Sequence, residues 1–148
     1  MSTYPAWPAF VCALLALFAK TTATSVLQVA SRLRARTFLL PEDAAMLGVK
    51  PVAEEAAFVR RCAGVWRNDV ENVPLFLALA FCWTLSGAGA FEAWLLFGLY
   101  AGLRWLHTAA FLAGLQPWRA ILYLSGLAVC WTIAARLAWR VLGPWSGA

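Results

Sequence analysis

Four long apolar runs dominate this chain of 148 residues and limit what it can fold into. The helices that we predict around them span about 7–34, 60–86, 90–114 and 118–142. A helix that crosses a lipid bilayer needs about 20 residues, and the second and fourth apolar runs, at about 73–85 and 120–135, reach that length only with their charged flanks in the helix. Hydrophobic residues make up 63% of the chain and charged residues only 13%, whereas a soluble domain usually carries about 25% charged residues. We therefore predict an all-α integral membrane protein with a single domain over residues 1–148.

The connections between these runs predict how the helices pack. Residues 86–89 (Ser-Gly-Ala-Gly) and 114–117 (Gly-Leu-Gln-Pro) are short turns. Residues 36–58 are longer, mixed in charge and contain two prolines, which indicates a loop outside the membrane. Short connections make consecutive helices antiparallel neighbours, so an up-down four-helix bundle is expected.

The distribution of basic residues predicts the orientation in the membrane. Seven of the twelve flank or fill the long loop: Arg32, Arg34, Arg36, Lys50, Arg60, Arg61 and Arg67. Basic residues favour the cytoplasmic side, so we place the loops after the first and third helices in the cytoplasm. Most of the nine tryptophans fall near the ends of the apolar runs and are expected to lie at the membrane interfaces.

Charged side chains within apolar runs are expensive in lipid and therefore candidates for function. In the segment Arg67 to Asn72, Arg67 and Glu71 share a helix face at spacing i, i+4, and Asn68 and Glu71 at i, i+3. The alternative is a solvated helix start, where Asp69 and Glu71 would sit near the positive end of the helix dipole. Both interpretations remain open from this segment alone.

The other three runs add polar residues at the same predicted cytoplasmic end. Arg104 and His107 are spaced i, i+3, and Arg119 and Tyr123 are spaced i, i+4, whereas Arg32 ends the first run. A lone histidine is often a core residue, and an arginine at a helix end often extends its side chain to the interface. Together, several arginines suit carboxylates, and Glu71 suits an ammonium. The expected ligand is a small anion with an amine, and no pattern indicates metal, nucleotide or nucleic acid binding.

The order and spacing of these motifs resemble the MAPEG family, the membrane-associated proteins in eicosanoid and glutathione metabolism. The resemblance covers almost the whole chain. It is carried by Arg32-Leu33-Arg34 with Pro41-Glu42-Asp43, Arg67-Asn68-Asp69-Val70-Glu71-Asn72, Leu85-Ser86-Gly87, Arg104-Trp105-Leu106-His107-Thr108 and Pro117-Trp118-Arg119-Ala120.

The resemblance implies a homotrimer that binds glutathione between subunits near the cytoplasmic face. It also implies a set of glutathione contacts: Arg32, Arg67, Asn68, Glu71, Arg104, His107 and Tyr123, with Arg119 as the residue that activates the thiol. A free thiol with a pKa near 8.5 is only a few per cent ionised at neutral pH. Lowering that pKa by two units corresponds to about 2.7 kcal/mol, which a neighbouring arginine can supply.

Two branches of the family imply different reactions. Ala120 and the helix-two motif are similar to the glutathione transferase branch, whereas Arg67 is similar to the prostaglandin E synthase branch. Phe111 stands where both branches have a tyrosine, which removes a hydroxyl that could donate to the thiol.

The leading hypothesis is a glutathione transferase acting on hydrophobic electrophiles, with reduction of lipid hydroperoxides as a further activity. The alternatives are a glutathione-dependent isomerase and a non-catalytic lipid-binding scaffold. The expected location is a bacterial inner membrane, or the endoplasmic reticulum in a eukaryote, with the active site facing the cytoplasm. Lys20, in the first run, is expected to extend to the interface or to face the trimer axis, and receives no function.

Overall fold

Four long helices and one short helix make up the fold. The structure is a computed structural model that describes residues 4–143, so the first three and last five residues of the expected domain lie outside it. All regular structure within residues 4–143 is helical, which confirms the all-α prediction. The helices are α1 (Trp7–Ala35), α2 (Pro41–Met46), α3 (Ala57–Leu85), α4 (Ala90–Ala113) and α5 (Trp118–Leu142).

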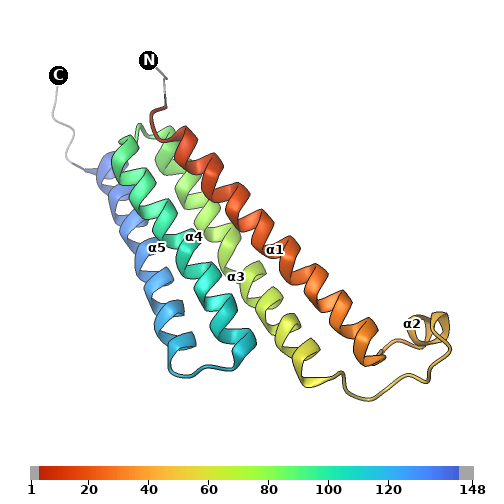
Figure 1. Cartoon of the computed structure of the whole chain (residues 1–148). Helices are drawn as coiled ribbons and strands as arrows, with labels where there is room; N and C mark the ends of the chain where they lie inside the picture. Colours follow the sequence, from red (N-terminus) through yellow and green to blue (C-terminus); the bar gives the residue numbers. More distant parts are fainter. Residues whose placement is uncertain (1–3, 144–148) are drawn as a thin grey trace.

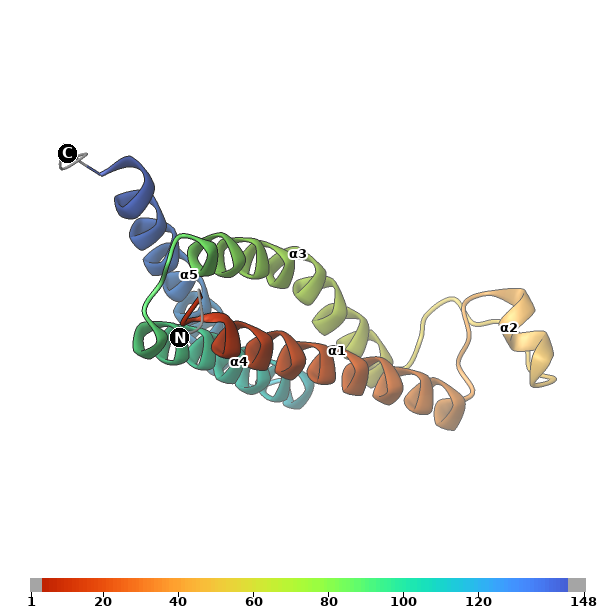
Figure 2. The ribbon, with the colours of Figure 1, turned by 90° about the horizontal axis from the view of Figure 1, so that it is seen from above.

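The four long helices lie side by side, with α1 beginning and α5 ending at the same end of the bundle (Figure 1). α3 packs against α1, α4 and α5, and α4 also packs against α1 and α5. α1 extends past its neighbours at the opposite end, where α2 lies apart from the bundle in both views (Figures 1 and 2). The segment 36–58, predicted as a loop, therefore carries a short helix of six residues.

Three of the long helices, α1, α4 and α5, are long and apolar enough to cross a membrane. α3 has the same length as α1 but is less apolar, because the charged segment that begins at Arg67 lies inside it. The outer surface of the bundle is rich in exposed large apolar side chains, for example Phe18, Leu75, Phe91 and Trp131. Such a surface suits contact with lipid better than contact with water.

Local sequence explains where the long helices begin and end. α4 ends at Gly114, whose positive φ of 71° favours glycine and turns the chain out of the helix. α3 ends before Gly87, and Arg140 of α5 donates hydrogen bonds to the carbonyl oxygens of Ser86 (3.1 Å) and Gly87 (2.5 Å). These bonds tie the end of α5 to the α3–α4 turn.

An aromatic core fills the half of the bundle where α1 begins and α5 ends. The Phe76 ring stacks on Tyr100 at 3.8 Å between centroids and meets Phe97 edge to face at 5.9 Å. Trp83 also meets Phe97 edge to face, at 5.7 Å, and is fully buried. Trp83 is therefore a core residue of the bundle rather than an exposed side chain at its surface.

We expect Phe76→Ala to lower the free energy of unfolding by about 3 kcal/mol, because it leaves a cavity beneath two other rings. Phe91→Ala, which truncates the same side chain where it is 81% exposed, is the matched control and should change stability by less than about 1 kcal/mol. Thermal unfolding of both variants in detergent micelles measures the difference. Equal melting temperatures would contradict the aromatic core.

Candidate functional site

A buried ionic cluster joins α1, α3 and α4 next to the aromatic core. Lys20 of α1 forms an ion pair with Oδ2 of Asp69, and its Nζ also donates to Thr108 Oγ1 at 3.2 Å. Arg104 of α4 pairs with the other oxygen, Asp69 Oδ1, at 3.0 Å. Lys20, Asp69 and Arg104 are 0%, 3% and 2% exposed. We call these three residues the ionic cluster.

Arg104 has further partners, all of them at Nη2. Its Nη2 donates to the side-chain oxygen of Asn68, and the backbone oxygen of Asn68 lies 3.4 Å away. Its Nε is buried and has no hydrogen-bond partner among the residues that the structure describes. Arg104 is thus held from one side by α3 while part of its guanidinium remains unpaired.

Sequence reasoning missed two members of this cluster. The sequence predicts Asp69 as a member of the helix-two motif or as an acidic residue at a solvated helix start, and it predicts Lys20 at the interface or at the trimer axis. In the single chain both side chains are buried against neighbouring helices, so Asp69 is not at a solvated helix start. The signal was present in the spacing, because Asp69 follows Val65 by four residues and precedes Phe76 by seven on the buried face of α3. Lys20 follows Leu17 by three on the buried face of α1.

Arg67 and Glu71, predicted to share a helix face, both lie on the exposed side of α3. Within residues 4–143 neither side chain takes part in an ion pair, although the i, i+4 spacing would permit one between them. Asn68 is half-buried and faces Arg104. The helix-two motif therefore divides into a buried part, Asn68 and Asp69, and an outward part, Arg67 and Glu71.

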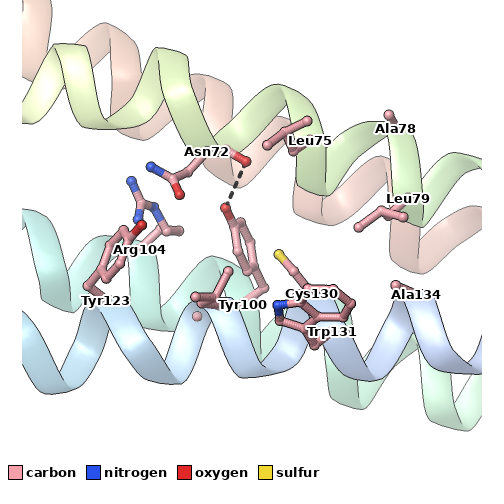
Figure 3. A pocket seen from close by; sticks show the side chains of 12 residues that line it. Asn72, Leu75, Ala78, Leu79, Tyr100, Arg104, Tyr123, Cys130, Trp131 and Ala134 are labelled. Atoms are coloured by element: carbon pink, nitrogen blue, oxygen red, sulfur yellow. Dashed lines mark hydrogen bonds between the residues drawn. The ribbon is translucent and has the colours of Figure 1, made fainter.

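A cavity of about 380 Å³ lies between α3, α4 and α5 beside the ionic cluster. Figure 3 shows Asn72, Arg104 and Tyr123 at one end of this cavity and Cys130, Trp131 and Ala134 toward the other. Tyr100 donates a hydrogen bond of 3.3 Å to the backbone oxygen of Asn72 between the two ends. The cavity therefore has a polar end beside Arg104 and an otherwise apolar wall.

Where α4 and α5 face each other, His107 meets the rings of Phe111 and Tyr123, and Arg119 lies on the Phe111 ring. The His107 ring centroid lies 5.9 Å from that of Phe111 and 6.4 Å from that of Tyr123. The Arg119 guanidinium carbon lies 4.6 Å from the Phe111 ring centroid, a cation–π contact. His107 is 3% exposed, and its Nδ1 has no partner within the described part of the chain.

Gly64 of α3 makes room for Phe111 at this point. A Cβ atom at residue 64 would lie 2.9 Å from Cζ of the Phe111 ring, which is closer than real Cβ contacts. Because Phe111 carries Arg119 on its face, the absence of a side chain at Gly64 helps to set where the guanidinium lies. The tyrosine hydroxyl that the resemblance implies at residue 111 is missing, and a stacked arginine stands there instead.

Arg32 stands apart from this group. It lies near the end of α1 and forms an ion pair with Glu55, a buried residue of the segment between α2 and α3. Of the predicted site residues, the single chain brings together Asn68, Arg104, His107, Arg119 and Tyr123, through contacts on α3, α4 and α5. Within residues 4–143, no ion pair joins Arg32, Arg67 or Glu71 to these residues.

Known proteins resemble this chain over most of its length. The chain is 32% identical over 137 residues to a prostaglandin E synthase of Homo sapiens, covering 92% of this chain and 90% of that protein. It is 35% identical over 111 residues to a microsomal glutathione S-transferase 1 of Homo sapiens, covering 72% of each. The profile of the MAPEG family matches residues 10–139. With this match and these relatives, the chain belongs to the MAPEG family, and its apolar helices make it an integral membrane protein.

Proposed function

We propose that this protein is a membrane-bound glutathione transferase that joins the glutathione thiolate to hydrophobic electrophiles. The observation that carries the proposal is Arg104, a buried arginine that lines the polar end of an otherwise apolar cavity. A cation there suits an anionic co-substrate, and the apolar wall suits an electrophile that dissolves in lipid. The relative named as a glutathione S-transferase supports this choice of co-substrate.

Glutathione has the charges that these residues could satisfy. It carries two carboxylates, which match arginine forks, and one ammonium, which matches Glu71. Arg67 and Glu71 are exposed and unpaired within residues 4–143, so they are available to a ligand. A second copy packed against this side of α3 would enclose such a ligand, which is consistent with the homotrimer that we propose. Arg32, already paired with Glu55, would have to exchange partners to join the site.

Arg119 is the residue that we assign to thiol activation. Arg119 is half-buried, and its guanidinium lies on the Phe111 ring, which also meets the His107 ring. A cation held in a partly dry site favours the thiolate over the thiol, and the thiolate is the nucleophile. The thiol first loses its proton to water, and the sulfur lone pair then forms the new S–C bond. In a substitution the leaving group departs with its bonding electrons, whereas in an addition the electron pair of the double bond takes up a proton from water.

A glutathione-dependent isomerase is the second candidate. The observation that favours it is the match to a prostaglandin E synthase over 92% of this chain, against 72% for the glutathione transferase. An isomerase would use the same thiolate without keeping the adduct. We further propose that all four long helices cross the membrane, and that basic residues around the long loop keep the site on the cytoplasmic side.

The direct test uses the purified full-length chain in detergent. We expect calorimetry to show glutathione binding, and glutathione with 1-chloro-2,4-dinitrobenzene to give conjugate. Binding without conjugation of any electrophile would favour the isomerase instead. Absence of binding would overturn both enzyme proposals and favour a lipid-binding scaffold.

We expect Arg119→Ala to lose most turnover while retaining measurable glutathione binding. If the bound thiol returns from a pKa near 6.5 to one near 8.5, the thiolate fraction at pH 7 falls by about 25-fold. The loss should shrink as the pH approaches 9, because the free thiol then ionises without help. Arg136→Ala, which removes an arginine paired with Glu92 farther along α5, is the control. Unchanged turnover in Arg119→Ala would refute the assignment.

We expect Glu71→Gln to weaken glutathione binding by about 10- to 100-fold, because a hydrogen bond to a charged group contributes about 1.5–3 kcal/mol. The kcat at saturating glutathione should change little. Deamino-glutathione, which lacks the ammonium, should bind the variant and the unmodified protein equally well in calorimetry. Glu54→Gln, at an exposed glutamate paired with Arg60, is the matched control. If Glu71→Gln weakens the binding of deamino-glutathione as much as it weakens the binding of glutathione, Glu71 does not hold the amine.

A further inference from the structure

The ionic cluster carries an uncompensated positive charge. Lys20 and Arg104 are cations, and the carboxylate of Asp69, which pairs with both, is the only anion in contact with them within residues 4–143. Two cations and one carboxylate leave a net charge of one. Transfer of a proton from Lys20 to Asp69 along their hydrogen bond would not change this sum. The charge of the cluster is therefore positive whichever of the two holds the proton.

No other group that faces the ionic cluster changes its net charge. Asn68 on α3 and Thr108 on α4 are uncharged, and Glu71 is on the exposed side of α3. His107 on α4 is buried with an unpaired Nδ1. A protonated ring would leave an N–H donor buried without a partner, which is expensive, so we count His107 as neutral.

A buried net charge is unfavourable unless a counter-ion balances it. Arg104 is the one member of the ionic cluster that lines the cavity, and its Nε is unpaired. An anion bound at the polar end of the cavity would supply the missing charge. With Asp69 and Arg104 alone, the pair would be neutral and an anion would gain little from binding there.

From this charge count, we infer that Lys20 sets the affinity of the cavity for its anionic ligand. Lys20 does so by neutralising Asp69, so that Asp69 can hold Arg104 in place without cancelling its charge. Lys20 lines no part of the cavity, so it acts through Asp69 and Arg104 and is a positioning residue. The inference rests on the proposed function only for the identity of the anion as glutathione.

Three variants test this charge count in the full-length protein. Lys20→Met makes the cluster neutral, Asp69→Asn raises it to two positive charges, and the double variant returns it to one. We expect Lys20→Met to weaken glutathione binding by about tenfold, as for one charge at roughly 10 Å in a medium of effective dielectric about 20. The double variant should bind within about twofold of the unmodified protein. Calorimetry measures the dissociation constants.

Recovery of glutathione affinity in the double variant would distinguish this electrostatic role of Lys20 from a purely structural one. If Lys20 and Asp69 only stabilised the fold, the double variant would bind no better than Lys20→Met. The KM for uncharged 1-chloro-2,4-dinitrobenzene should stay constant across the series, while the KM for glutathione follows the charge. Of the three variants, Asp69→Asn carries the greatest risk of misfolding, because it buries two unbalanced cations. The comparison of Lys20→Met with the double variant does not depend on it.

The outcomes distinguish the two proposals. If the unmodified protein binds glutathione and Lys20→Met binds it equally well, the role of Lys20 is overturned while the proposed function stands. The same conclusion follows if the double variant fails to recover affinity although its melting temperature matches that of Lys20→Met. If the unmodified protein does not bind glutathione, the proposed function and the ligand named here both fail.

Discussion

The carboxylate of Asp69 bridges two cations from different helices beneath the surface of the bundle, and much of the site depends on it. Through one oxygen it pairs with Lys20 of α1 and through the other with Arg104 of α4. Three helices are thereby connected at the level where the aromatic core ends. Ion pairs of this kind are costly to bury and costly to break. Where lipid surrounds the bundle, water cannot replace a lost partner, so the arrangement is strongly specified.

The pairing of Asp69 determines how Arg104 is held beside the cavity. Asp69 and Asn68 hold Nη2 of the Arg104 guanidinium, and Arg104 lines the space between α3, α4 and α5. On the α5 side, Phe111 supports Arg119 and is itself accommodated by Gly64. Two arginines on different helices are thus fixed by different means, one by ion pairing and one by an aromatic face. A site with two separately fixed cations suits a ligand with more than one anionic group.

Family membership and geometry contribute different parts of the functional proposal. One relative is named as a prostaglandin E synthase and another as a glutathione S-transferase, so family membership alone does not choose between the two reactions. The geometry favours an anion beside an apolar compartment, which both reactions require. Because Arg67 and Glu71 point outward, a single chain does not bring together all of the predicted glutathione contacts. That incompleteness is a physical reason to expect a second copy at this face of α3.

The sequence by itself determined the helical membrane class, because four apolar runs with so few charges have no other stable arrangement in lipid. It also identified Arg104, His107, Arg119 and Tyr123 as polar residues at one level, since their spacing and short connections require it. Only the tertiary structure decided which charges pair. Lys20 and Asp69 are 49 residues apart, and no local pattern couples them, although each lies on the buried face of its own helix. Burial of α3 against α1 and α4 selects Asp69 for the interior and leaves Arg67 and Glu71 outside, because residues two apart on a helix point in different directions.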